Sequence, residues 1–523
     1  MTAVIATNVV RSKPRPASKG GRRTTYVLIA GSLSLLIGGL GWFDWYSGRL
    51  GLIGPQPTIE SNGGGGRIIK LPSGGNLQSA IDRAEGGDVI ELEPGGIYAG
   101  QISLPNKPIT EYITIRSAAA DKLPEGKRIT PADRVNMAVV TSGILGRPAI
   151  LAENAAHHYR FVGIEFTSAG TIFNYGLVVL GNGEKRPELV PHDIEIDRSY
   201  FHPHRPGRSR RGVALNSADT VIKNSYFEGF AVEGEEGQGI CGWTGTRNVR
   251  VINNYVEGGA QNIMFGGADP PNAEMIPAGI EVRENHLNKP KDWVGKYTIK
   301  TIFELKDARN VVFADNLLTN NWIGSAFRIT VRNQDGKAPF STIENVVIRG
   351  NVIDNAGDGI NILGRDDNFP SQVLRGLTIE NNLLLNIGAK GLEGSGYFIQ
   401  ASEGESITIA NNTSLNSGNI VTLHGNIPRG FIFRDNITGH GDYGIHAPLD
   451  RRSDAAKAMF FGNVFINLNR IDASGFSFPD GNLMVNDIGD VGFTDPAGCN
   501  FVLTTKSKFK GKGASIDQID RWR

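Results

Sequence analysis

The sequence predicts an all-β solenoid in which short parallel strands stack, coil upon coil, into a β-helix behind one membrane-spanning helix. Two observations predict the rod: a short apolar phrase recurs along the body, and an asparagine returns at the same place in it. An uncharged run near the N-terminus predicts the membrane helix. The composition suits many tight turns between short strands, because 68 of the 523 residues are glycine.

The N-terminal region divides into segments of different composition. Residues 1–23 are basic without acidic side chains, and the uncharged run at 24–43 is long enough, at about 20 residues, to cross a bilayer as a helix. The basic residues place that end in the cytoplasm, and Trp42, Trp45 and Tyr46 suit the membrane interface. We expect a cytoplasmic tail at 1–23, an uncleaved signal-anchor at 24–46, a flexible linker at 47–66 and a periplasmic or extracellular body at 67–523. A cleaved signal peptide is the alternative.

Charge and cysteine content restrict the partners and the source of stability. A net charge of +1 gives no general attraction to nucleic acid, so we expect no DNA or RNA partner. Cys241 and Cys499 lie far apart along a rod, so packing rather than a disulfide must stabilise the fold.

The recurring phrase runs from IEIDRSYF at 194 to FIFRDNIT at 431, with starts roughly 25 to 35 residues apart, the spacing of a solenoid. Each phrase alternates apolar and polar residues, as a strand with one inward face does. Asparagine tolerates left-handed backbone, and its amide can bond to the coils above and below, so we expect a ladder at a tight corner. Its members are Asn254, Asn285, Asn316, Asn351, Asn382, Asn412 and Asn436.

The front of the body carries a different pattern. Leu77, Ala80, Ile81 and Ala84 have the i, i+3, i+4, i+7 spacing of an amphipathic helix, which could cover the open apolar end of the first coil. Gly86-Gly87 ends this helix, and strand patterns begin at Val89.

These residues resemble a known family, the right-handed parallel β-helix proteins of the pectate-lyase-like superfamily, which includes alginate and chondroitin lyases. The resemblance depends on LQSAIDRAEGGDVIEL, the Asn-ended phrases, and FVLTTKSKFKGKGA from Phe501, which is similar to the last coil of such proteins. It covers residues 67–523 and implies a right-handed parallel β-helix. It does not imply one chemistry, because the superfamily holds lyases, hydrolases, esterases and non-catalytic adhesins.

A second short strand follows each asparagine phrase, and stacking should align these strands in one parallel sheet. Phe303, Phe327 and Ile360 are expected to point inward, so the opposite parity faces out. That outward row reads Glu304, Lys306, Arg328, Thr330, Asn361, Gln400, Thr422, His424 and His446. Cations and amides in a row suit an extended acidic polymer, whereas the alternative is a solvated face whose charges pair among themselves.

On a uronate-containing polymer, β-elimination needs the carboxylate neutralised, the neighbouring proton removed and the leaving oxygen protonated. A lysine or arginine with a depressed pKa can be the base. The catalytic candidates are Lys306 as base and Arg328 as carboxylate clamp, with Glu304 beside them and Lys300 in reserve. This pair is similar to the Lys and Arg of the chondroitin and alginate lyases, although the Glu to Lys spacing of that family is not reproduced here.

Further candidates lie in the row and in the loops beside it. The predicted substrate contacts are Asn262, Asn361, Arg365, Gln400, His424, Arg205 and Trp243. Arg205 belongs to the basic segment 202–211, which is either a polyanion contact or a solvated loop. Asp269, Asp366 and Asp367 could hold Ca²⁺ through oxygen ligands or could form Asx turns.

We therefore expect a membrane-tethered polysaccharide lyase that cleaves an acidic, uronate-containing polysaccharide by β-elimination. The alternative is a non-catalytic glycan-binding or envelope-scaffold β-helix. Glycoside hydrolysis ranks third, because Asp366-Asp367 and His440 lie about three coils apart on such a solenoid.

Overall fold

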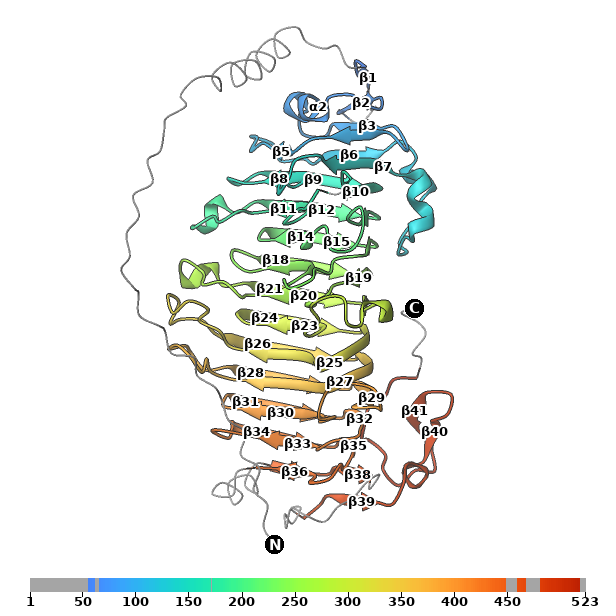
Figure 1. Cartoon of the computed structure of the whole chain (residues 1–523), viewed down its shortest axis with the longest axis vertical. Helices are drawn as coiled ribbons and strands as arrows, with labels where there is room; N and C mark the ends of the chain where they lie inside the picture. The colour runs from blue at the N-terminus through green and yellow to red at the C-terminus, as the bar shows by residue number, and fades with distance from the viewer. Residues whose placement is uncertain (1–54, 62–64, 171, 448–458, 467–479, 518–523) are drawn as a thin grey trace, which may run out of the picture. The chain divides into compact units, whose positions relative to one another are not determined.

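The computed structural model describes residues 55–61, 65–170, 172–447, 459–466 and 480–517, and these residues stack as successive coils of β-strands (Figure 1). The predicted cytoplasmic tail and signal-anchor lie outside the described residues. Within the described ranges, none of the helices has both the length and the apolar character needed to span a bilayer.

Face 1 of the stack is a 15-stranded sheet made from the recurring phrases. Its strands pair in parallel from coil to coil, except for the antiparallel pair at the front. In order they are β1 Thr58–Ser61, β2 Arg67–Leu71, β3 Val89–Leu92, β6 Ile113–Ser117, β9 His157–Val162, β12 His192–Asp197, β15 Ala218–Lys223, β18 Arg247–Ile252, β21 Ala278–Arg283, β24 Ala308–Ala314, β26 Ile343–Arg349, β28 Arg375–Glu380, β31 Glu405–Ala410, β34 Arg429–Arg434 and β37 Met459–Phe461.

Faces 2 and 3 form a second sheet of 24 parallel strands, which the long strands β25 Leu317–Thr330 and β27 Val352–Leu363 join by crossing both faces. The other strands of face 2 are β4 Ile97–Ala99, β7 Ala138–Ser142, β10 Ile164–Ser168, β13 Tyr200–Phe201, β16 Tyr226–Phe227, β19 Tyr255–Glu257, β22 His286–Asn288, β29 Leu383–Ile387, β32 Thr413–Asn416, β35 Ile437–Gly439, β38 Val464–Ile466 and β39 Leu483–Val485. Those of face 3 are β5 Ile102–Leu104, β8 Ile150–Ala152, β11 Val178–Leu180, β14 Arg211–Leu215, β17 Gln238–Gly242, β20 Gln261–Phe265, β23 Phe303–Leu305, β30 Ile399–Ser402, β33 Val421–Leu423 and β36 Ile445–His446.

The core runs along the inside of the coils. Alternation makes one side of each strand apolar, and Phe303, Phe327 and Ile360 all enter one continuous buried cluster, as predicted. Short 3-10 turns lie in the loops between strands: Ala120–Lys122, Pro131–Asn136, Pro187–Leu189, Ala273–Met275, Lys291–Trp293 and Ile488–Val491.

The predicted asparagine ladder is confirmed at the corner between faces 1 and 2. Asn316 donates its backbone N–H and its Nδ2 to Oδ1 of Asn351, at 2.9 and 3.0 Å, and Asn351 repeats both bonds with Asn382. The ladder continues past the predicted members to Asn463 and Asn482. These amides are fully buried as far as Asn463, so the ladder satisfies backbone groups that the corner would otherwise leave without a partner.

The left-handed residue of this corner is the one before each ladder asparagine, which corrects the sequence prediction. Asn253, Glu284 and Asp315 have φ of 53°, 59° and 56°, and Gly350 has 67°. The corner needs one left-handed residue to turn the chain from face 1 to face 2, and the next side chain then points inward and joins the ladder.

The predicted capping helix is confirmed as α2, Leu77–Arg83, at the front end of the stack (Figure 1). Oδ1 of Asn76 accepts the backbone N–H of Ser79 at 2.9 Å, which caps its N-terminus. Leu77, Ala80 and Ile81 are buried against the first coil. Residues 58–61 of the predicted linker form β1, so the folded body begins before residue 67.

The segment from Phe501 is not the last coil of the rod. Asn500–Leu503 is strand β41 of an antiparallel hairpin with β40, Phe493–Asp495, beside the final coils (Figure 1). The chain then crosses face 2 backwards, where Ala514 donates its N–H to Thr413 Oγ1 and Ser515 donates to Asn381 Oδ1. The C-terminal segment packs there because the outer side of face 2 is hydrophobic, and Phe501 and Phe509 cover it.

Candidate active site on face 3

The predicted polar row lies in register on face 3. Glu304 pairs with Arg328, Arg328 with Asn361, and Asn361 with Gln400, each on adjacent parallel strands. Thr422 and His446 continue the same line. Of the nine residues predicted to face outward, these six form one line, and from here on the outward row means these six. Neighbouring members stand about 4.8 Å apart, the spacing of paired strands.

A second line of side chains emerges beside the outward row because strict alternation breaks at the start of each strand. Asn262 and Ile263 both donate their N–H to the carbonyl of Ile302, as in a β-bulge. Consecutive residues such as Ile302 and Phe303 therefore both enter the core. The side chains before them instead join polar contacts on the outside, and we call Gln238, Gln261, Ser325, Asp358 and Tyr397 the shoulder row.

Glu304 is held from the shoulder row. Nε2 of Gln261 donates to Oε2 of Glu304 at 2.6 Å, and Nε2 of Gln238 donates to Oε1 of Gln261 at 3.0 Å. Although Glu304 lies on the outward side of the sheet, it is only 3% exposed. Among the described residues no cation bonds to this buried carboxylate, and the amide of Gln261 is its hydrogen-bond donor.

Lys300 is engaged by Glu236, a residue that precedes β17. The two side chains form a short ion pair. Burial alone would raise the pKa of Glu236, but the bond from Lys300 and the nearby charge of Lys306 hold it below its usual value. Lys306 is not part of that ion pair. It lies against Gly267, where an added methyl group would come within 3.3 Å of Cδ of Lys306.

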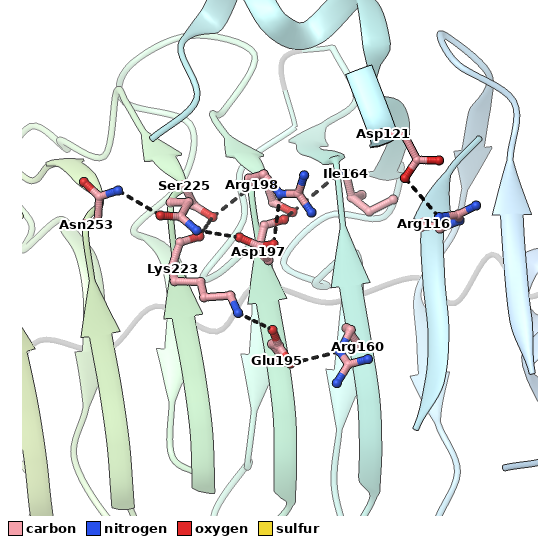
Figure 2. Close-up of polar contacts among 12 residues, drawn as sticks. Arg116, Asp121, Arg160, Ile164, Glu195, Asp197, Arg198, Lys223, Ser225 and Asn253 are labelled. Atoms are coloured by element: carbon pink, nitrogen blue, oxygen red, sulfur yellow. Dashed lines mark hydrogen bonds and ion pairs between the residues drawn. The ribbon is translucent and has the colours of Figure 1, made fainter. Parts of the chain in front are cut away.

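Several charges on face 1 form ion pairs within the protein. Figure 2 shows Arg160 and Lys223 converging on Glu195 from the strands on either side, at 2.9 and 2.7 Å. Arg328 and Lys306 differ, because neither forms an ion pair with any carboxylate in the described part of the chain. Both are partly exposed. Face 3 thus presents two cations that remain available to an external anion.

The amides of the row bond to each other. Nδ2 of Asn361 donates to Oε1 of Gln400 at 3.1 Å. Both amides are partly exposed and keep donor and acceptor capacity for sugar hydroxyls. Glu304, Arg328, Asn361 and Gln400 are therefore brought together as predicted.

Other predicted substrate contacts lie elsewhere. Asn262 is fully buried, and its Nδ2 donates to the carbonyls of Val256 and Asn288, so this prediction is wrong because the amide closes a corner inside the rod. Arg365 pairs with Glu403 in the loop after β27.

The remaining candidates lie outside the row. His424 is exposed just after β33, and Arg205 is exposed in the loop between β13 and β14. Trp243 is partly buried, and the guanidinium of Arg211 lies 4.9 Å from its ring centroid. Whether a sugar reaches them stays a prediction.

The acidic residues proposed for Ca²⁺ have protein partners. Asp366 accepts the N–H of Asn368 two residues on, an Asx turn, and the N–H of Asn333. Asp367 pairs with Arg332. Asp269 accepts two backbone N–H groups of the 331–341 loop through Oδ2, while Oδ1 is buried without a hydrogen-bond partner.

Across the described ranges, no group of three or more His, Cys, Asp or Glu is placed to hold a metal. The three aspartates therefore do not form one cage, and the contacts of Asp366 are those of the Asx-turn alternative. The calcium prediction itself stays a prediction.

Sequence reasoning missed the shoulder row and Glu236. Strict alternation would have hidden Tyr397, because two successive core residues, Phe398 and Ile399, follow it. Gln261 is followed by the bulge at Asn262 and Ile263, which also breaks the alternation. One signal was available: glutamine opens both QGICG at 238 and QNIMF at 261, a repeat of a polar residue before an apolar strand.

No protein-family model and no curated protein match the sequence. Solved structures do match. An alginate lyase from Paenibacillus sp. is 14% identical over 73% of this chain and 99% of its own, with a TM-score of 0.37. A mannuronic acid specific family 6 polysaccharide lyase from human gut microbiota is 14% identical over 80% of this chain and 91% of its own, with a TM-score of 0.47. An α-1,3-glucanase of family 87 from Streptomyces thermodiastaticus is 13% identical over 79% of this chain and 69% of its own, with a TM-score of 0.42.

The chain is a parallel β-helix protein. Its own strand register establishes this. One fold can host many chemistries, so the activity must be argued from the side chains of face 3.

Proposed function

We propose that this protein is a polysaccharide lyase that cleaves an acidic, uronate-containing polysaccharide by β-elimination on face 3. The observation that supports the proposal is the position of Arg328 and Lys306: among the described residues neither has an ion-pair partner, and both stand beside in-register polar groups. On face 1, by contrast, Arg160 and Lys223 share the carboxylate of Glu195. Two open cations on one face attract an anionic ligand.

The chemistry divides among the residues of the row. Arg328 binds the uronate carboxylate through two parallel N–H bonds and stabilises the charge that develops there. The amine of Lys306 removes the proton on the carbon next to the carboxylate. Asn361 and Gln400 bond to hydroxyls of the following sugars, and Glu304 keeps the Arg328 guanidinium near the row by Coulomb attraction.

The membrane tether belongs to the same proposal. Residues 24–46 anchor the chain with the N-terminus inside, so the rod meets its polymer on the periplasmic or extracellular side. Fractionation of cells that express the full chain tests this, with protease added to intact cells or spheroplasts. The body should sediment with membranes and be degraded from outside.

The activity is tested with the full-length protein on alginate, pectate, chondroitin and heparosan, with and without Ca²⁺. A lyase forms an unsaturated uronate, which absorbs in the ultraviolet, from at least one polymer. Lys306→Ala should reduce that rate by about 10²- to 10⁴-fold while melting as the wild type does. Lys127→Ala is the matched control, because Lys127 is exposed on a loop away from face 3.

Other outcomes identify the alternatives. New reducing ends without ultraviolet absorbance would indicate hydrolysis. Retarded migration in a polymer-containing gel, with no product of either kind, would favour the non-catalytic glycan-binding or scaffold protein. Full activity of Lys306→Ala would remove the assigned base.

A further inference from the structure

Tyr397 reaches back along the rod. Its Cα belongs to the coil of Gln400, yet its hydroxyl lies 2.7 Å from Oγ of Ser325, on the coil of Arg328. Ser325 on β25 pairs with Asp358 on β27, and β27 pairs in turn with β30, the strand that follows Tyr397. The tyrosine side chain therefore spans two strand spacings. The phenol is thereby delivered to the coil that carries the proposed carboxylate clamp.

Two fixed groups hold the ring in this position. Asp358 lies on the coil between, and its Oδ1 accepts the N–H groups of Ser395 and Gly396 at 2.7 and 2.8 Å. These bonds fix the backbone immediately before Tyr397. Oγ of Ser325, at 2.7 Å, holds the phenol itself. Tyr397 is only 7% exposed, so its neighbours pack the ring in place.

The phenol keeps its proton at neutral pH. Burial raises the pKa of Tyr397, and the carboxylate of Asp358 raises it further. In the bond to Ser325 either hydroxyl can be the donor. When Ser325 donates, the phenol O–H is free to donate to a ligand on the row.

Lys306 and the Tyr397 phenol flank Arg328 on opposite sides. Glu304 and Arg328 pair side by side. Along the strand direction, Lys306 lies two positions beyond this pair, and Ser325, which bonds to the phenol, lies three positions before it. A sugar whose carboxylate is bound by Arg328 therefore meets an amine on one side and a phenol on the other.

We propose that Tyr397 is the general acid that protonates the leaving glycosidic oxygen. Lys306 takes the proton from C5, the C5–H electron pair becomes the C4=C5 double bond, and the C4–O bond breaks with its electrons on oxygen. The phenol proton moves to that oxygen. The phenolate then recovers a proton from water through Ser325, and Lys306 releases its proton to water.

This assignment rests on the proposed function, and the test separates the two. Full-length wild type, Tyr397→Phe and Tyr175→Phe are compared on whichever of the four polymers the wild type cleaves. Tyr175 is 57% exposed in the loop before β11, several coils from Arg328, and serves as the control. Tyr397→Phe should lower kcat by about 10²- to 10⁴-fold with little change in KM, whereas Tyr175→Phe should match the wild type.

An activated substrate distinguishes an acid from a packing residue. An analogue that carries a nitrophenyl group on the uronate O4 expels a stable anion and needs no proton donor. Tyr397→Phe should regain wild-type turnover on this analogue, while Lys306→Ala stays inactive on both. Ser325→Ala, which keeps the phenol, should lower kcat on the polymer by less than Tyr397→Phe does.

Three results would overturn the assignment. Equal kcat of Tyr397→Phe and wild type on the polymer removes the acid role and leaves the lyase proposal intact. Equal losses of Tyr397→Phe on polymer and analogue show a structural role instead. A wild type that forms no unsaturated product from any polymer removes the lyase proposal and this assignment with it.

Discussion

Gln261 donates a hydrogen bond to the carboxylate of Glu304 across 43 residues of sequence, at 2.6 Å and out of contact with solvent. The bond joins successive coils and gives the buried carboxylate its amide donor. Gln261→Leu should lower the free energy of unfolding by about 1–3 kcal/mol, because a buried acceptor loses its partner. Denaturant titration measures the change, and Gln101→Leu, at a partly exposed position, is the control. An unchanged midpoint for Gln261→Leu would show that solvent satisfies Glu304.

The asparagine ladder should be a main source of stability. Asn351→Ala removes the acceptor for Asn316 and leaves the carbonyls of Phe313 and Arg349 without their donor. We expect a loss of about 2–4 kcal/mol, since several buried groups lose partners at once. Thermal and denaturant unfolding measure it. Asn106→Ala, at an exposed position, should leave both midpoints unchanged, and equal behaviour of the two variants would contradict the ladder's role.

Asp307 should make stability fall as pH rises. Burial raises its pKa from 3.8 to about 8, although Ser341 and the N–H of Thr342 donate to it. Between those values the unfolded chain gives up a proton that the folded chain retains. Stability from this group is therefore complete at acid pH and is lost by about pH 8.

Asp307→Asn cannot titrate, and its amide can donate to Ser341 while its oxygen accepts from Thr342. The variant should melt higher than the wild type at about pH 9 and with little difference at about pH 4. Melting curves across that range measure the effect. A constant difference between the variants at every pH would contradict a protonated Asp307.

Asp366 should stabilise its loop without calcium. Asp366→Ala removes the acceptor for the N–H groups of Asn333 and Asn368, so we expect a loss of about 1–3 kcal/mol. The melting temperature should fall by the same amount in EDTA and in Ca²⁺. A wild type that melts higher in Ca²⁺, with that gain lost in Asp366→Ala, would instead establish the metal site.

Arg328 should contribute directly to polymer binding. Arg328→Ala should weaken binding of the cleaved polymer about tenfold, the effect of losing one charge-assisted contact, and should flatten its dependence on salt. Affinity electrophoresis at two ionic strengths measures both. Arg250→Ala, on face 1, is the matched control, and equal weakening by the two variants would indicate general electrostatics instead of a site.

The sequence predicts what repeats locally. Alternation in the phrases identifies face 1, and the recurring asparagines identify the corner, because each depends on neighbours within a few positions. Leu77, Ala80 and Ile81 likewise predict α2 through helical spacing. The register of Glu304, Arg328 and Asn361 follows once every coil contributes one strand to face 3.

The features that the sequence does not predict depend on contacts between distant segments. The bulge at Asn262 arises where the chain turns from face 2 to face 3. Apart from the repeated glutamine, no local pattern marks the change of parity that places the side chains of Gln261 and Tyr397 on the outer side of the sheet. The C-terminal segment crosses face 2 because apolar side chains of several coils leave a surface to cover. Such docking is a property of the assembled rod and is not encoded in any one repeat.

Equivalent positions on successive coils make the rod a linear scale. Exchanging the side chains of Arg328 and Asn361, with Arg328→Asn and Asn361→Arg, would translate the guanidinium by about 4.8 Å without rotating it. The carboxylate clamp would then bind a different unit of the same bound chain, while Lys306 stays in place. We therefore expect the exchange to change the sizes of the released oligosaccharides more than the rate of their release.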